Sequence, residues 1–265
     1  MKKYVEIAKI LFKAQMIYRF DVIMTAVSTI WRVAFAWILW GTIFAGRDEV
    51  GGFTLQAMLS YYVISSFFAT TDMSGGVSIE VSERIKEGTF SKFMVIPSNP
   101  QFHFLSQTIG TSAYYGLFAA LAAVVSALVF RINLLFTADP RQIVLAIAMF
   151  FLGIVFMSSY QFFLGIWAFK YQDIRFLLFT FPVIVQFFKG EFVPLSLLPE
   201  VMIHILRYFP FTHVSYTPAM LLTGRMYFSE GLFGLAVLGV WTVGMMIVGQ
   251  LAYKRLRMKY EGVGI

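Results

Sequence analysis

Residues 142–169 read QIVLAIAMFFLGIVFMSSYQFFLGIWAF, an apolar run that contains no charged side chain. About 20 such residues suffice for a helix to cross the roughly 30 Å hydrocarbon core of a bilayer. The run is too long and too uniformly apolar for a core helix of a soluble fold. This stretch therefore predicts a membrane-spanning helix and sets the class of fold for the rest of the chain.

The composition of the whole chain agrees with this prediction. Of its 265 residues, 59% are hydrophobic, 18% are aromatic and 13% are charged. A soluble domain carries roughly 25% charged residues, and disordered chains are poor in aromatic residues. These proportions argue against a water-soluble enzyme and against a disordered chain. We expect an all-α integral membrane protein.

Five further segments complete a prediction of six membrane spans. The fifth span is the shortest and contains Pro182. Between the fifth and sixth spans, prolines divide residues 189–230 into apolar runs too short to cross a bilayer, which predicts re-entrant or interfacial helices on the outer side. Such helices would either gate an outward pathway or only pack at the interface. The six spans are expected near residues 21–45, 53–79, 104–130, 142–169, 176–190 and 231–253.

The distribution of positive charge predicts the orientation. The net charge of +7 would suggest a nucleic-acid partner in a soluble protein, but basic residues of a membrane protein gather on its cytoplasmic side. With both termini inside, 14 of the 21 Lys and Arg residues lie on inner segments and 6 on outer ones. We therefore expect cytoplasmic termini, contact with membrane lipid, no nucleic acid and a place in the cell membrane, most naturally the bacterial cytoplasmic membrane.

Residues 1–20 precede the six-span domain of residues 21–265 and predict an interfacial helix. Its apolar residues recur every three or four positions, and the charged residues fall on the opposite face. Such a helix lies in the membrane interface, where it either anchors the first span or also contacts a cytoplasmic partner. The apolar face holds Tyr4, Ile7, Leu11, Ala14 and Tyr18, and the charged face holds Lys2, Glu6, Lys9 and Lys13.

The loop between the second and third spans is the most informative polar stretch. Residues 78–100 read SIEVSERIKEGTFSKFMVIPSNP and predict a charged helix that ends at Gly88, with Glu80 and Arg84 spaced for an ion pair. Exposed apolar side chains rimmed by charge favour docking into a partner's groove. A solvated loop whose aromatic residues dip into lipid is the alternative. The apolar side chains expected to be exposed are those of Phe90, Phe93 and Met94.

Two charged residues fall inside predicted spans. Arg32 lies roughly 16 Å and Asp72 roughly 12 Å from the inner ends of the first and second spans. Because each charge alone would be costly in the membrane, we expect an intramembrane Arg32–Asp72 pair that holds the two spans together. A substrate or proton site is the alternative. Gln107, Gln161 and Gln186 are expected to form hydrogen bonds between helices.

Catalytic and metal sites are not predicted. The chain has no cysteine, and its three histidines are scattered along the sequence, so neither a metal-ligand spacing nor a thiolate nucleophile is present. The phosphate-binding pattern GxxxxGK[ST] is also absent. If the chain pumps a substrate, another subunit has to hydrolyse ATP.

The order of these features resembles the ABC-2 class of ABC-transporter permease, within it the ABC-2 family transporter subgroup. The resemblance covers the whole chain and depends on the order of its parts. These are a basic amphipathic start, six spans with both ends inside, a charged loop after the second span and proline-broken helices before the last. The residues that carry it are Gly88-Thr89-Phe90, Pro97-Ser98-Asn99-Pro100, Phe209-Pro210-Phe211 and Thr223-Gly224.

This resemblance implies the permease subunit of an ATP-driven exporter. Such a permease pairs with a second copy or a sister permease, and two separate ABC ATPase subunits bind ATP and Mg below it. Residues 83–94 would supply the coupling helix, residues 170–175 a smaller contact, and an amphipathic substrate would pass along the interface lined by spans one, two and five. The coupling residues implied are Glu83, Arg84, Glu87, Gly88, Thr89, Phe90, Lys92, Phe93 and Met94.

Two other classes of function compete with the exporter. A secondary transporter driven by an ion gradient tends to show inverted repeats and buried acids, but no repeat is apparent and only Asp72 is a convincing buried acid. An intramembrane enzyme needs clustered catalytic groups at depth, and the sequence does not provide them.

Overall fold

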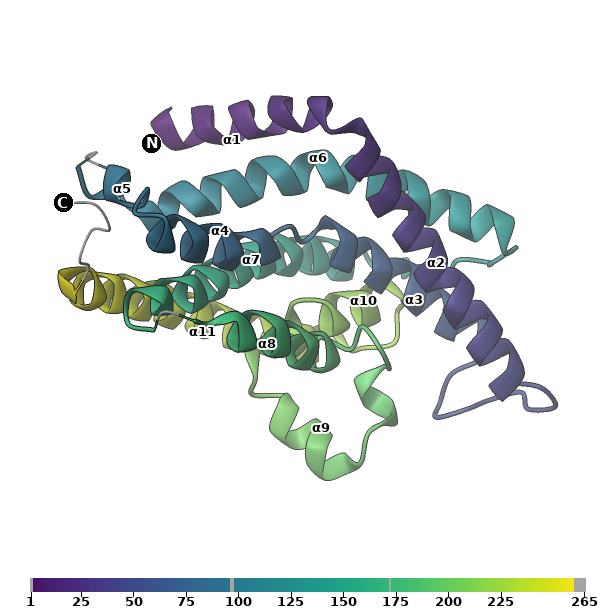
Figure 1. Cartoon of the computed structure of the whole chain (residues 1–265). Coiled ribbons are helices and arrows are strands. Elements are labelled where there is room, and N and C mark those ends of the chain that lie inside the picture. The colour runs from purple at the N-terminus through teal and green to yellow at the C-terminus, as the bar shows by residue number, and fades with distance from the viewer. Residues whose placement is uncertain (1, 96–97, 172, 260–265) are drawn as a thin grey trace.

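The computed structural model describes residues 2–95, 98–171 and 173–259, and Figure 1 shows their arrangement. The described residues form helices, turns and one isolated bridge between Val50 and Phe53, and 79% of them are helical. The all-helical class expected from the sequence is therefore confirmed.

Within the part of the chain that the structure describes, four helices are long and apolar enough to cross a membrane. They lie in α2 (Arg19–Ile43), α6 (Pro100–Val129), α7 (Pro140–Gly165, extended by the 3-10 helix η2, Ile166–Phe169) and α11 (Phe228–Leu256). They correspond to the first, third, fourth and sixth predicted spans. Proline at the first position of α6 and α7, preceded by Asn99 and Asp139 as caps, begins both helices at a defined residue.

The second predicted span is broken in the structure. Helix α3 (Leu55–Thr71) ends at Asp72, and α4 (Gly75–Lys86) begins after Ser74. Asp72 caps the break because its Oδ1 accepts a hydrogen bond from the backbone N–H of Ser74 at 3.2 Å, a local bond that competes with the helix. The two glycines that follow also weaken helix formation. The uninterrupted span expected over residues 53–79 is therefore two helices.

The fifth predicted span is the short helix α8 (Arg175–Phe188). Its 14 residues extend over about 21 Å, less than the thickness of the hydrocarbon core. Helices α3 and α8 both fall short of a full crossing, and the count of six spans stays a prediction.

Helices α6, α7 and α11 run side by side, and one end of the bundle gathers three described parts of the chain. These are the start of α1 (Lys2–Ala14), the end of α11 and residues 83–94, which we call the coupling segment. Figure 1 shows the N-terminus of α1, α5 (Ser91–Val95) and the C-terminal end of α11 together at this end. A 3-10 helix, η5 (Arg257–Lys259), continues α11. We call this the coupling end of the bundle.

The N-terminal helix α1 has the two faces expected from the sequence, but it is shorter than residues 1–20. It ends at Ala14, and the 3-10 helix η1 (Gln15–Ile17) leads into α2. The apolar face lies against the first half of α6, where Gly110 approaches the backbone of Ala8 so closely that no larger side chain fits. Its position in the membrane interface stays a prediction.

Short helices form the segment before α11, and their place as re-entrant or interfacial helices on the outer side stays a prediction. They are η3 (Leu195–Leu197), α9 (Glu200–Leu206), η4 (Pro210–His213) and α10 (Tyr216–Leu222). Pro199 and Pro210 lie at breaks, whereas Pro218 lies inside α10. Figure 1 shows α9 projecting away from the long helices.

Two hydrophobic clusters lie at different levels of the bundle. One is built around Tyr61, Trp40 and Tyr216, on α3, α2 and α10. The other, at the coupling end, is built around Phe90 and Tyr253 and joins α4, α6, α7 and α11. Along the chain, Asp72 lies between Phe68 of the first cluster and Val77 of the second.

Candidate charge cluster and coupling surface

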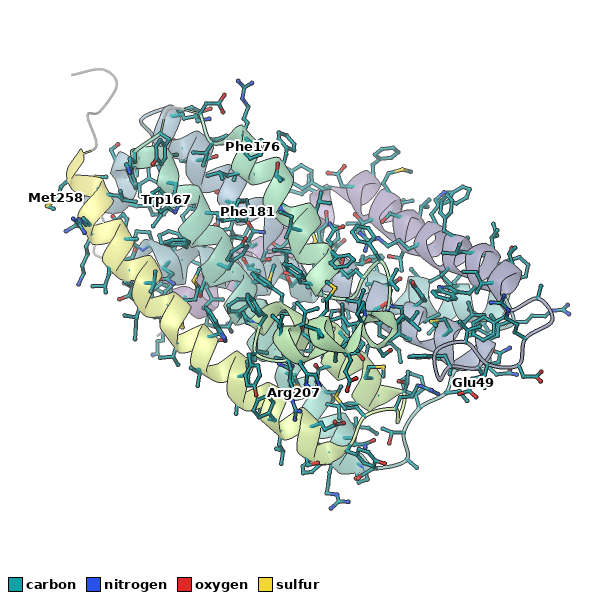
Figure 2. All side chains as sticks on the ribbon, turned by 90° about the horizontal axis from the view of Figure 1, so that it is seen from below. Glu49, Trp167, Phe176, Phe181, Arg207 and Met258 are labelled. Atoms are coloured by element: carbon teal, nitrogen blue, oxygen red, sulfur yellow. The ribbon has the colours of Figure 1, made fainter. Side chains whose placement is uncertain are left out.

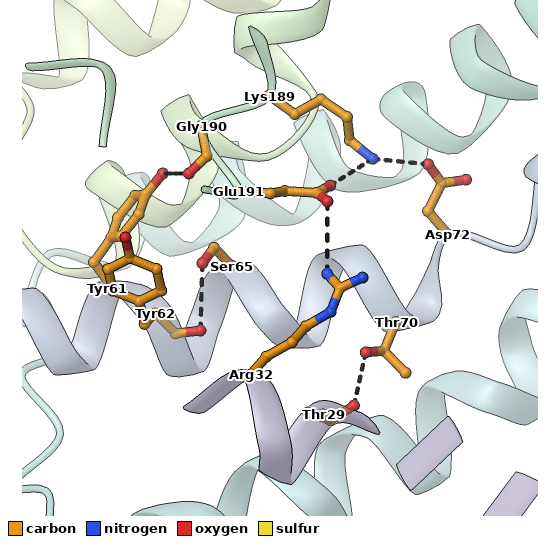
Figure 3. A network of polar contacts seen from close by, with 10 residues as sticks. All are labelled: Thr29, Arg32, Tyr61, Tyr62, Ser65, Thr70, Asp72, Lys189, Gly190 and Glu191. Carbon is orange, nitrogen blue, oxygen red and sulfur yellow. Dashed lines mark hydrogen bonds and ion pairs between the residues drawn. The ribbon is translucent and has the colours of Figure 1, made fainter. Parts of the chain in front are cut away.

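A chain of four charged side chains crosses the interior where α8 ends (Figure 3). Lys189 follows the last residue of α8, and its Nζ lies 3.1 Å from Oδ2 of Asp72 and 2.8 Å from Oε1 of Glu191. Oε2 of Glu191 lies 3.6 Å from the guanidinium of Arg32 on α2. We call Arg32, Glu191, Lys189 and Asp72 the charge cluster.

The charge cluster replaces the direct Arg32–Asp72 pair expected from the sequence. Both residues belong to the same network, but Lys189 and Glu191 stand between them. The difference arises because α8 is short, so that its end reaches the break between α3 and α4 instead of an outer surface. The signal in the sequence was Lys189-Gly190-Glu191, two opposite charges directly after an apolar run.

The charge cluster is balanced and mostly buried. The side chains of Asp72, Lys189 and Glu191 are 8%, 7% and 5% exposed, whereas that of Arg32 is 46% exposed. Two positive and two negative groups give no formal net charge. A buried charge is tolerated when it is paired, and removing one partner is strongly destabilising because the other stays buried. Arg32 is the one member of this cluster with substantial access from outside.

Two tyrosines hold the backbone around Lys189 against α3. The Tyr61 hydroxyl donates to the carbonyl oxygen of Gly190, and the Tyr62 hydroxyl to that of Phe192, both at 2.6 Å. Gly190 has a φ of +71°, a left-handed conformation that favours glycine. These contacts position the charged side chains on either side of Gly190.

A polar cavity of about 120 Å³ adjoins the charge cluster. Its walls come from α2, α3, α4, α7 and α8, and they include all four charged side chains. Among the described residues, neither the hydroxyl of Ser74 nor Oε1 of Gln161 has a hydrogen-bond partner, although both side chains are buried. Buried polar groups in proteins are nearly always satisfied by protein or water, so this cavity suits water or the polar part of a ligand.

The coupling segment begins where α4 ends. Gly88 has a φ of +77°, and the backbone N–H of Phe90 donates to the carbonyl oxygen of Arg84 at 2.9 Å, a glycine-terminated helix end. On α4, Arg84 pairs with Glu80 at 2.7 Å. The helix end at Gly88 and the Glu80–Arg84 pair are both as predicted.

The aromatic residues of the coupling segment are not exposed as predicted. Phe90 is fully buried, and Phe93 and Met94 are half-buried. The turn at Gly88 folds the segment back onto the bundle, where the Phe90 ring lies 5.3 Å from that of Phe169 and 6.1 Å from that of Tyr253. The apolar face therefore packs on its own chain, an outcome that an amphipathic pattern cannot distinguish from a docking face.

Charged and polar side chains make the outer face of the coupling segment. Arg84, Gly88 and Thr89 are half-buried. A groove of about 330 Å³ runs between α4 and the following turn, lined by Glu80, Arg84 and Thr89 together with exposed charges. We call the exposed residues the coupling surface: Glu83, Lys86, Glu87, Ser91 and Lys92.

The second predicted contact, residues 170–175, lies beside the coupling surface; Gln172 is outside the described residues. Asp173 and Arg175 form an exposed ion pair at 2.7 Å. Hydrogen bonds from Arg175, together with smaller contributions that include the nearby charge of Lys86, lower the pKa of the Asp173 carboxyl to about 2. The influence of Lys86, on α4, shows that the two predicted contacts are neighbours.

A larger cavity of about 470 Å³ lies between the short helices and α11. Its walls are mainly apolar, with polar groups that include His204, Arg207, His213 and Arg225. The imidazole of His213 is held between the hydroxyl of Thr217 and the carbonyl oxygen of Arg207. This cavity was not anticipated from the sequence, because it depends on how α9, η4 and α10 are placed relative to α11.

Comparison with known proteins gave one finding. Residues 30–264 match the model of a family described as ABC-2 family transporter protein. No curated protein and no solved structure matched the chain. The matched range contains the charge cluster and the coupling surface and leaves out α1.

Proposed function

Because the chain belongs to the ABC-2 family of transporter proteins, we propose that it is the permease of an ATP-driven exporter. It is a multi-pass membrane protein by its family and its apolar helices. Membrane subunits of this family work with ABC ATPase partners. In this proposal two separate ATPase subunits bind ATP and Mg, and the present chain forms the path for an amphipathic substrate.

The coupling surface is the observation that supports ATPase docking most directly. It places two carboxylates, two ammonium groups and a hydroxyl on one exposed turn, with the turn of residues 170–175 beside it. Charge complementarity favours specific docking and fast association. A partner that binds here meets polar side chains, and the aromatic residues beneath them keep the turn in place.

The contacts of Phe90 provide a route for movement from the coupling surface into the bundle. Phe90 packs against the end of α7 through Phe169 and against α11 through Tyr253. A partner that pushes the coupling surface would therefore move these helices as a packed unit, the kind of rigid-body change that switches transporters. Helix α4 carries the same movement toward Asp72, at the other end of the helix, where the charge cluster begins.

The proposed assembly holds two permease subunits, as a homodimer or with a sister chain. Both termini and the coupling surface would face the cytoplasm, which agrees with their common location at the coupling end (Figure 1). Exposed apolar side chains of α2 and α8, such as Trp31, Phe35 and Phe179, would face the second subunit and the substrate path. The α3–α4 unit and α8 would complete the six spans.

Charge reversal on the coupling surface tests this proposal. The chain is co-expressed with the ABC ATPase encoded nearest to it, and co-purification and ATPase rate are measured. Lys86→Glu with Lys92→Glu is expected to weaken docking at least about tenfold, with membrane insertion intact. The matched control, Arg47→Glu with Arg131→Glu, reverses two exposed charges on segments predicted to be outer and is expected to leave docking unchanged.

The competing secondary transporter makes the opposite prediction. If the purified chain accumulates substrate in ATP-free vesicles under an ion gradient, the exporter proposal is wrong. If the ATPase binds equally strongly to both charge-reversal variants, the coupling surface is not its docking site.

A further inference from the structure

Arg32 lies at the middle of a membrane-spanning helix and is incompletely paired. The candidate span in α2 runs from Phe20 to Ile43, so Arg32 is close to its midpoint. The guanidinium carries five N–H donors, and its ion pair with Glu191 is 3.6 Å long, beyond the about 2.7–2.9 Å of a charge-assisted hydrogen bond. A half-exposed arginine at this depth has donors available for a ligand.

The cavity beside Arg32 offers additional groups to the same ligand. Ser74 and Gln161 are 1% and 4% exposed, line the cavity and have unpartnered oxygens among the described residues. The Ser74 hydroxyl can donate to a ligand oxygen, whereas the amide oxygen of Gln161 only accepts and therefore contacts an anion only through bridging water or a protonated oxygen. The cavity volume of about 120 Å³ equals roughly four water molecules at about 30 Å³ each, enough for one small head group.

The charge cluster favours an anion over a cation at this site. Its two carboxylates are engaged by Lys189, which is buried between them. The accessible member is the positively charged Arg32. A cation entering here would meet the guanidinium of Arg32 first and be repelled by it. An anion would instead pair with this guanidinium, which is already partly removed from water.

The surroundings of Arg32 require that such an anion also be apolar. Phe35 lies three residues along α2, on the same face, and is 67% exposed. Trp31 is exposed beside it, with its ring 6.1 Å from that of Phe35. Across the cavity, α8 contributes the apolar side chains of Pro182 and Val185, and Figure 2 labels two further phenylalanines of this helix, Phe176 and Phe181, which are partly exposed. A molecule that reaches Arg32 through this apolar surface has to be amphipathic.

We propose that Arg32 and the adjoining polar cavity bind the anionic head group of an amphipathic molecule, a phosphate or a carboxylate, with its tail along the apolar face of α2. This inference assigns a substrate class to the proposed function. It rests on the proposed function only in treating the bound molecule as the transported substrate. The binding itself needs no ATPase.

Binding is measured on the purified chain in phosphatidylcholine nanodiscs through the fluorescence of its tryptophans, one of which is Trp31. The probes are dodecyl phosphate and dodecyltrimethylammonium, which share a tail length and differ in charge. The wild-type chain is expected to bind the phosphate at least about tenfold more tightly, the effect of a hydrogen-bonded charge pair. Equal affinity for the two probes would overturn the proposal.

Variants separate binding at Arg32 from general attraction to a basic protein. Arg32→Gln is expected to lose the preference for the anion, and Arg32→Lys to keep part of it. The double variant Arg32→Gln with Glu191→Gln leaves Lys189 and Asp72 as a balanced pair, so this chain is expected to fold. Loss of anion binding in the double variant would then result from loss of the site and not from misfolding. Arg47→Gln removes an equal charge from an exposed loop and is expected to keep the preference. An unchanged preference in the double variant would refute the site.

The source of the anion is distinguished in a second arm. In phosphatidylglycerol nanodiscs, competition with dodecyl phosphate would identify an anionic lipid as the occupant, whereas undiminished binding would favour a single-tailed cargo. Both results support an anion site, because both depend on Arg32. A wild-type chain that binds the anion but does not dock the ATPase would contradict only the exporter proposal. A wild-type chain that docks the ATPase but shows no preference for the anion would contradict only this inference.

Discussion

The charge cluster and the coupling surface contain the same kinds of side chain and use them differently. In the interior, two carboxylates and two cations balance in charge within one network, and three of the four are nearly inaccessible. At the coupling end, Glu83, Glu87, Lys86 and Lys92 are exposed. Charges removed from water need partners from their own chain, whereas solvated charges remain available to another protein. The difference distinguishes a site that holds the fold together from a surface that can dock.

The largest expected effect is the loss of the central cation of the charge cluster. Lys189→Met leaves Asp72 and Glu191 buried without their shared partner, which is expected to cost about 3–5 kcal/mol. The measurement is the thermal unfolding midpoint in nanodiscs. The control Lys92→Met, at the coupling surface, is expected to change stability by less than about 0.5 kcal/mol, and similar losses in both variants would remove the contrast between the two regions.

The next effect tests whether the aromatic residues below the coupling surface are structural. Phe90→Ala is expected to destabilise the chain by about 3 kcal/mol, because Phe90 is fully buried. Phe93→Ala, at a half-buried position, is expected to cost less than half as much. Chemical unfolding of the two variants gives the comparison. If Phe90→Ala kept full stability and lost only ATPase docking, Phe90 would be a docking residue as the sequence alone predicted.

A smaller effect is expected from the tyrosine that supports the charge cluster. Tyr61→Phe removes the hydroxyl that donates to the carbonyl oxygen of Gly190 and keeps the packing of the ring. The expected cost is about 1–2 kcal/mol, because a buried acceptor loses its donor. Tyr208→Phe, at an exposed side chain, is the matched control for the same measurement, and an equal cost for the two variants would contradict a specific role for Tyr61.

The smallest effect concerns the exposed pair beside the coupling surface. The pKa of Asp173 is about 2, below its ordinary 3.8, so the pair stabilises the folded chain above pH 3.8 and loses that contribution as the pH falls toward 2. At neutral pH, Asp173→Asn is expected to change the unfolding midpoint very little, since exposed pairs contribute little. A carboxyl NMR titration gives the pKa directly, and a value near 3.8 would show that Arg175 does not hold this carboxylate.

The sequence predicted the long elements well and the contacts between distant residues poorly. The apolar run of residues 142–169 became α7 with η2, and Gly88 ends α4 as its lack of a side chain suggests. The break at Asp72 was missed, because the apolar pattern continues through it. The partners of Arg32 and Asp72 were also missed, since they depend on the end of α8, more than a hundred residues along the chain from Asp72.

Taken by itself, the sequence determined that this chain is a helical membrane protein with charge concentrated near one loop, because hydrophobicity and charge are properties of composition and order. Only the tertiary structure decided which side of an amphipathic segment is buried: Phe90 packs inward, and Lys86 and Lys92 remain outside. It also decided that Lys189 stands between Asp72 and Glu191. Both outcomes depend on which helix surfaces meet when the helices pack, and the separation of residues along the chain does not specify which surfaces meet.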